Sequence, residues 1–298
     1  GRKCEGTPIM SRDILTAIQN RMPTFSKGQK LIAHFILDSY DKAAFMTASR
    51  LGKTVNVSES TVVRFAAELG YDGYPSMQKA LQEMIRSKLT SIQRIEVAND
   101  RIGDQDILST VMQSDIEKIR LTLEETDRGG FHRAVDALLS ARRIYVMGAR
   151  SAAALADFLG FYFNLIFDDV VLIRTTSVSE TFEHLLRVSC EDVVIGISFP
   201  RYSSRTVQAL RFARDRGANV VAITDSETSP LTETATVALL AKSDMASFVD
   251  SLVAPLSLIN ALIVAVGRRK NADVAQTFST LEKIWSAYGV YEQVEEEN

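Results

Sequence analysis

Five short apolar runs, separated by stretches of helical length, constrain the fold of this 298-residue chain more than any other feature. The runs are residues 143–147, 170–173, 193–197, 220–223 and 237–240. Each is apolar almost throughout, which is typical of strands that are covered on both faces. Amphipathic stretches at 151–165, 179–188 and 204–216 separate the first four runs. Because strands and helices alternate, we predict a five-stranded, parallel, doubly wound α/β sheet.

The first third of the chain shows helical periodicity without a strand pattern, which predicts an all-helical domain over residues 11–89. Residues 90–104 are polar and irregular, and we expect a linker there. The second domain is expected over residues 105–288. It would begin with a helix at 107–125, ended by Gly129-Gly130, and close with helices at about 246–269 and 272–288. The predicted fold class is therefore α plus α/β.

Within the helical domain, residues 46–75 contain two short helices joined by a tight turn. Apolar residues recur at helical spacing on the inner face of each helix. Asn56-Val57 form the turn, Ser58 can cap the second helix, and Gly70 ends it. Two helices at this spacing form a helix-turn-helix, which lays its second helix in the DNA major groove. An ordinary helical hairpin is the alternative that the pattern leaves open.

Two features of the first third favour duplex DNA as its partner. The exposed face of the second helix would carry Glu59, Ser60, Thr61 and Arg64, whose short polar groups and guanidinium suit base edges and phosphates. Residues 1–95 hold 14 Lys and Arg against 8 Asp and Glu, a net charge of +6, whereas the remainder holds 20 against 29, a net of −9. A basic module joined to an acidic one is typical of a nucleic-acid reader with a second function.

Composition argues against several other classes of protein. Cys4 and Cys190 are too few for a disulfide framework, so a reducing, cytoplasmic compartment is expected. His34, His132 and His184 lack metal-ligand spacing, and GxGxxG is absent, so we expect neither a metal nor a nicotinamide cofactor. The longest apolar run, 252–266, is shorter than the roughly 20 residues of a membrane span.

Polar side chains follow the first three predicted strands, at the edge where doubly wound sheets bind ligands. The loop at 148–151 leads directly into a helix, whose first backbone N–H groups suit a phosphate or carboxylate. The residues expected to contact such a ligand are Gly148, Arg150, Ser151, Thr176, Ser177, Ser198, Arg201 and Ser203. Two arginines among hydroxyls predict a small anionic metabolite. The alternative is that Ser151, Ser179 and Ser204 are helix caps and nothing more.

Two features together resemble the RpiR family of bacterial transcriptional regulators. The first is the sequence VSESTVVRF at 57–65, followed by LGYDGY at 69–74. The second is a C-terminal SIS (sugar isomerase) domain with the loops just described. The resemblance covers residues 11–288, nearly the whole chain. It implies a homodimer or homotetramer that binds double-stranded operator DNA, senses a phosphosugar or related metabolite, and controls carbohydrate-uptake or catabolic genes.

Carried onto this sequence, the resemblance implies particular contacts with DNA. Operator contacts would come from Ser58, Ser60, Thr61 and Arg64, and phosphate contacts from Lys53, Tyr74 and Lys79.

The strand-end loops depart from the family's pattern. Where the family has GxGxS, this chain has the shorter Gly148-Ala149-Arg150-Ser151. Where it has SxSGxT, Ser198 remains, but Pro200, Arg201 and Ser203 replace the later serine, glycine and threonine. Losing a glycine weakens a cradle of backbone N–H groups, and two arginines offer charge in its place. An anionic effector is therefore expected, with a sugar acid as an alternative to a phosphosugar.

A ligand-controlled transcription factor, rather than an enzyme, is the preferred hypothesis. The alternative is a sugar-phosphate isomerase or lyase with an accessory helical domain, since fold alone does not decide function. Isomerisation needs a general base, for which Glu180, Glu183 and His184 are the local candidates. A third hypothesis is an oligomerising module with a vestigial pocket.

Overall fold

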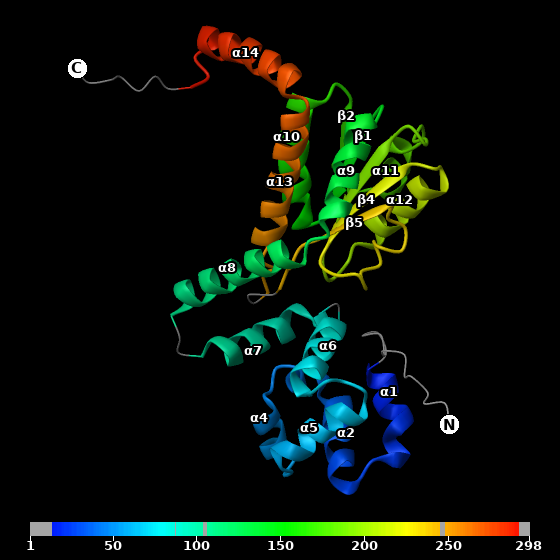
Figure 1. The fold of residues 1–298 in the computed structure, drawn as a ribbon, viewed down its shortest axis with the longest axis vertical. Coiled ribbons are helices and arrows are strands. Elements are labelled where there is room, and N and C mark those ends of the chain that lie inside the picture. The colour runs from blue at the N-terminus through cyan, green and yellow to red at the C-terminus, as the bar shows by residue number, and fades with distance from the viewer. Residues whose placement is uncertain (1–13, 87, 104–105, 245–247, 292–298) are drawn as a thin grey trace, which may run out of the picture. The chain divides into compact units, whose positions relative to one another are not determined.

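The computed structural model describes residues 14–86, 88–103, 106–244 and 248–291, and the chain divides into two compact units. The first unit holds the described residues up to Ser114 together with Asp244 and 248–251. The second holds Asp115–Ser243 and the described residues from Leu252 onward. Figure 1 shows helices in the first unit, and a sheet with flanking helices in the second. The predicted fold class is confirmed. Residues 11–13, 104–105 and 246–247 of the predicted segments lie outside the described residues.

The helical unit is built from short helices, and several of them begin at capping hydroxyls. Its elements are α1 (Ile14–Arg21), the 3-10 turn η2 (Met22–Thr24), α2 (Lys27–Asp38), α3 (Tyr40–Ala43), α4 (Ala48–Thr54), α5 (Glu59–Glu68), α6 (Tyr74–Arg86) and α7 (Ser91–Ile102). Ser26, Thr47, Ser58 and Thr90 each accept a backbone N–H from the residue three positions on. The apolar faces of the helices from α1 to α7 close on one buried core.

The expectation of an irregular linker at 90–104 is wrong for most of that segment, because α7 occupies it. Thr90 and Gln93 form a reciprocal capping box: Gln93 N donates to Thr90 Oγ1 at 3.3 Å, and Thr90 N donates to Gln93 Oε1 at 2.9 Å. Val97 and Ala98 are buried. A polar helix with a narrow apolar stripe is stabilised by packing, which its composition does not reveal.

The second unit contains the predicted parallel sheet. Its strands are β1 (Ile144–Gly148), β2 (Val170–Ile173), β3 (Val193–Ile197), β4 (Asn219–Thr224) and β5 (Val237–Leu240). All neighbouring pairs are parallel, in the order β2-β1-β3-β4-β5. The order reverses between β1 and β3, which makes this the switch point at which doubly wound sheets bind ligands. Gly148 pairs with Ile197, so the loops after β1 and β3 start side by side.

Helices cover both faces of the sheet, as Figure 1 shows for the second unit. On one face lie α9 (Arg128–Ser140), α10 (Ala152–Ile166) and α13 (Val253–Arg269), which pack on alternate strand residues such as Val146, Ile195 and Ile223. On the other lie α11 (Val178–His184) and α12 (Ser204–Asp215), next to Tyr145 and Val194. Strands buried on both faces explain the continuous apolar runs.

Two element boundaries differ from those expected. α8 (Ile107–Glu125) covers the predicted range, but Gly129-Gly130 lie in the first turn of α9 instead of ending α8. A Cβ at Gly130 would lie 2.6 Å from Asp127 Oδ2, so glycine there makes room for the carboxylate before the helix. α13 begins at Val253, after the start expected at about 246.

The C-terminal helix α14 (Asn271–Tyr288) has no buried residue. None of the helices in the described part of the chain is long and apolar enough to cross a membrane.

The contact between β3 and α12 yields a stability prediction at Gly196. A Cβ there would lie 2.7 Å from Leu210 Cδ1 and 2.9 Å from its Cγ, in a fully buried site. Gly196→Ala is expected to cost about 1–3 kcal/mol through overpacking and to lower the urea midpoint followed by circular dichroism. Gly267→Ala in α13 is the control, since its Cβ would make an ordinary 3.8 Å contact with Ile166. An unchanged midpoint for Gly196→Ala would contradict this packing.

Candidate functional site

The turn between α4 and α5 brings two stretches of backbone into direct contact. Asn56 adopts a φ of 58°, in the left-handed region, and Val57 N donates to Gly52 O at 2.8 Å. A Cβ on Gly52 would lie 2.8 Å from Val57 O, so only glycine leaves room for the turn. This contact fixes the angle at which α5 leaves α4. The sequence contained the signal, a glycine inside a short helix, but its role depends on a neighbour that only the structure shows.

The exposed face of α5 carries the polar residues that the sequence predicted. Val62, Phe65 and Ala66 are buried, whereas Ser58, Ser60 and Arg64 are exposed and Thr61 is half-buried. Ser58 Oγ accepts from Thr61 N at 3.3 Å and lies 2.9 Å from Ser60 Oγ. Arg64 Nε donates to Ser60 O at 3.3 Å, and its terminal nitrogens have no partner among the described residues. These donors are available to an acceptor outside the protein.

The three predicted phosphate contacts differ in their surroundings. Lys53 and Lys79 are exposed. Tyr74 is only 4% exposed, and its hydroxyl donates to Met46 O at 2.7 Å. Burial raises the pKa of Tyr74 to about 12. The prediction of a phosphate contact at Tyr74 is therefore wrong, because this side chain anchors α6 inside the unit.

The loop after β1 folds tightly onto the start of α10. A Cβ on Gly148 would lie 2.5 Å from Ala152 O, so the backbone of the loop needs glycine at this position. Arg150 has a φ of 56° and is exposed, as is Ser151. A non-glycine residue in the left-handed region thus makes the bend of this short loop.

The loop after β3 is organised around a buried hydroxyl. Ser198 is 4% exposed, and its Oγ accepts from Ser203 N at 3.0 Å. Ser203 caps α12 by accepting from Thr206 N at 3.2 Å. Arg201, between them, is exposed. A hydroxyl can donate one hydrogen bond while it accepts another, so Ser198 can also donate to an anion.

Neighbouring loops are tied to this one by side chains that the sequence did not single out. Tyr202 donates its hydroxyl to Asp225 Oδ1, in the loop after β4, at 2.8 Å. Arg205 Nη1 donates to Thr175 O in the loop after β2. Three strand-end loops are thereby held together. Tyr202, Arg205 and Asp225 carry no motif, and their roles depend on contacts across the sheet.

The loop after β2 presents Thr176 and Ser177. Thr176 is exposed, and Ser177 caps α11 by accepting from Glu180 N at 3.4 Å. The Glu180 carboxylate accepts a hydrogen bond from Thr175 Oγ1, and Glu183 and His184 are exposed on α11. These three candidate bases thus lie on the surface. Among the described residues no group of three or more His, Cys, Asp or Glu could hold a metal ion.

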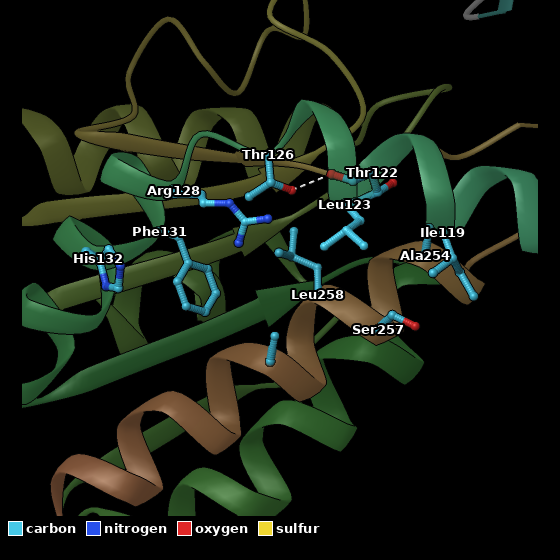
Figure 2. Close-up of a pocket in the computed structure, with 11 residues that line it drawn as sticks. Ile119, Thr122, Leu123, Thr126, Arg128, Phe131, His132, Ala254, Ser257 and Leu258 are labelled. Carbon is cyan, nitrogen blue, oxygen red and sulfur yellow. Dashed lines mark hydrogen bonds between the residues drawn. The ribbon is translucent and has the colours of Figure 1, made fainter.

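A pocket of about 320 Å³ lies between α8, α9 and α13, and sequence reasoning missed it. Figure 2 shows Arg128 and Phe131 pointing into the space bounded by Leu123 and Leu258. Its lining residues are Ile119, Thr122, Leu123, Thr126, Arg128, Phe131, His132, Ala254, Ser257, Leu258 and Ala261. None of them is a predicted ligand contact.

Comparison with known proteins supports two linked domains. Residues 12–88 match the helix-turn-helix domain of the rpiR family, and residues 137–265 match the SIS domain. The chain is 27% identical over 274 residues to the HTH-type transcriptional regulator HexR of Escherichia coli (strain K12), covering 87% of this chain and 90% of that protein.

Two solved structures are similar to this chain. The sugar isomerase domain of an RpiR transcription factor from Sphaerobacter thermophilus is 28% identical, with a TM-score of 0.58, covering 60% of this chain and 99% of that one. The NanR protein of Vibrio vulnificus, complexed with ManNAc-6P, has a TM-score of 0.57 at 22% identity, covering 91% of this chain and 98% of that one. The second similarity is evidence of a shared fold alone.

The backbone contact at Gly52 can be tested by one methyl group. Gly52→Ala places a Cβ against Val57 O and is expected to destabilise the helical unit by about 1–3 kcal/mol. The control is Gly28→Ala in α2, where a Cβ would lie 3.4 Å from Thr61 Cγ2 and 3.5 Å from Val57 Cγ1. Amide hydrogen exchange of α4 and α5 reports the result. Equal protection in both variants would show that the turn tolerates a side chain.

Proposed function

Because the chain carries an rpiR-family helix-turn-helix domain followed by a SIS domain, we propose that it is a ligand-responsive transcriptional regulator rather than an enzyme. In this proposal α5 binds operator DNA, and the strand-end loops bind a small anionic metabolite. The observation that carries it is the exposed polar face of α5, where the two terminal nitrogens of Arg64 have no partner within the described part of the chain. The similarity to a HexR regulator over most of both chains supports the same conclusion.

On the DNA, Ser58, Ser60, Thr61 and Arg64 would face the major groove, while Lys53 and Lys79 would contact phosphates. A guanidinium matches the acceptors of guanine, and lysines supply the charge that steers the protein to the duplex. We propose a homodimer that binds an inverted repeat, because a two-fold protein matches a two-fold operator. The compartment of such a regulator would be the cytoplasm.

In the SIS domain, a phosphosugar or sugar acid would contact the loops that follow β1, β2 and β3. Ser198 would donate its hydroxyl, while Arg150 and Arg201 would supply charge beside Gly148, Ser151 and Ser203. Thr176 and Ser177 would border the sugar. The likeness in fold to a protein complexed with ManNAc-6P supports this class of effector. Genes of carbohydrate metabolism are the proposed targets.

Removing the guanidinium of Arg64 tests whether α5 recognises DNA. Duplexes are enriched from a random pool by the wild-type protein, and their affinity is measured by fluorescence anisotropy at physiological salt. Arg64→Ala is expected to lose about 1–3 kcal/mol of binding free energy, a factor of roughly 5 to 150. Arg211→Ala, an exposed arginine on α12, should bind as the wild type does. No enrichment over random duplex, or full binding by Arg64→Ala, would refute the proposal.

Effector binding is tested by thermal shift with ManNAc-6P, glucose 6-phosphate, fructose 6-phosphate, gluconate and inorganic phosphate. A ligand at one hundred times its Kd stabilises the folded chain by about 2.7 kcal/mol, which raises the melting temperature measurably. Arg201→Ala and Ser198→Ala should each abolish most of that rise, whereas Arg211→Ala should keep it. A panel without any selective rise would leave the SIS domain as an assembly module.

The same samples test the enzymatic alternative. Nuclear magnetic resonance of each sugar phosphate after incubation with the protein should show no interconversion. Conversion that Glu180→Gln abolishes would instead establish an isomerase and overturn the proposal.

A further inference from the structure

The connection between β5 and α13 leaves one unit and is held in the other. The second unit ends at Ser243 and resumes at Leu252, whereas Asp244 and the described residues 248–251 belong to the helical unit. Ser251 N donates to Asp244 O at 2.9 Å and closes this segment on itself. One continuous length of chain therefore runs from the end of β5 into the helical unit and back.

The starting point of this connection lies beside the proposed effector loops. Because β5 runs parallel to β4, as β4 does to β3, it ends at the same sheet edge as both. Ala241 N donates to Thr224 O at 2.9 Å. Asp225, which follows Thr224, accepts a hydrogen bond from the Tyr202 hydroxyl at 2.8 Å. Tyr202 belongs to the loop that holds Ser198 and Arg201. A rearrangement of that loop would thus act on the segment that follows β5.

The other end of the connection is fixed by an ion pair inside the helical unit, between a buried arginine and a partly exposed aspartate. Arg94 on α7 is 5% exposed, and its Nη1 donates to Asp250 Oδ1 at 2.7 Å. Its Nη2 donates to the carbonyl of Arg86, the last residue of α6, at 3.2 Å. One guanidinium therefore binds the connection and the end of α6 at once. Removing the charge of Asp250 would leave the buried guanidinium of Arg94 without its counter-charge.

α6 in turn holds the entrance to the helix-turn-helix. Tyr74 Oη and Gln78 Nε2 donate to Met46 O at 2.7 and 2.8 Å, and Gln82 Nε2 donates to Ala44 O at 2.8 Å. These donors are four residues apart and so share one face of α6. The carbonyls they bind lie just before α4. The position of α4 and α5 therefore follows that of α6.

We propose that Arg94 is the positioning residue that couples the SIS domain to the helix-turn-helix, through its ion pair with Asp250 and its bond to the end of α6. The inference rests on the proposed function and deepens it, since it names the contact through which an effector would alter operator binding. Allosteric coupling needs a structural element whose conformation depends on both binding sites. The joint formed by Arg94, Asp250 and the carbonyl of Arg86 is that element. If the ion pair had no such role, it would stabilise α7 alone.

Hydrogen exchange of the full-length, effector-free chain tests the joint directly. Asp250→Asn keeps the shape of the side chain and removes its charge, and it should raise exchange at least threefold in α6 and in residues 44–54. The double variant with Arg94→Met should exchange no faster there than Arg94→Met alone. Asp273→Asn, an exposed carboxylate on α14, is the control and should change neither segment. Faster exchange confined to α7 would overturn the proposal.

The coupling itself is measured as the ratio of two operator affinities, one with and one without a sugar phosphate. The compound used is the sugar phosphate that gives the largest thermal shift. For Asp250→Asn the ratio of the two affinities should approach one, while calorimetry without DNA gives the compound's Kd within twofold of the wild-type value. An unchanged ratio would overturn the proposal. If the wild type binds no sugar phosphate, the proposed effector is wrong, and the exchange experiment still decides whether the joint exists.

Discussion

The parallel direction of all five strands is the constraint on which the second unit depends. It forces every connection to cross over the sheet, which places helices on both faces and explains why each strand is apolar throughout. It also delivers every strand-end loop to one edge. With the order reversed between β1 and β3, Gly148 and Ser198 emerge from adjacent strands. The two loops therefore start side by side, although they are far apart in the sequence.

A comparable constraint acts in the helical unit, where the carbonyl of Val57 lies against Gly52. That approach leaves α5 one angle relative to α4, and the apolar face of α5 then decides which residues remain outside. Arg64 is exposed because Phe65 and Val62 must be buried. The face offered to DNA is thus a consequence of core packing and turn geometry, which need no contribution from the DNA.

Strands that leave continuous apolar runs could be predicted from the sequence, whereas contacts between residues far apart in the chain could not. Strands β2, β3 and β5 have the expected limits, because strands buried on both faces leave unbroken apolar runs. α7 was not predicted from the sequence, because its stripe of buried residues is narrow. α9 was not predicted either, because the glycine pair in the first turn of that helix is typical of a helix end. Tyr74 was misassigned since nothing local shows that its hydroxyl binds the carbonyl of Met46. The ties made by Arg205 and Asp225 likewise exist only across the folded sheet.

The loop after β3 also indicates how an anion would be held. Pro200 has no N–H, and the N–H of Ser203 already binds Ser198 Oγ, so fewer backbone donors face outward than in a glycine-rich cradle. In the proposed site, the remaining attraction would come from the Ser198 hydroxyl and the exposed guanidinium of Arg201. The planar guanidinium can donate two parallel hydrogen bonds to a carboxylate as well as to a phosphate. In the proposed effector site, Arg201 would therefore suit a sugar acid as well as a phosphosugar.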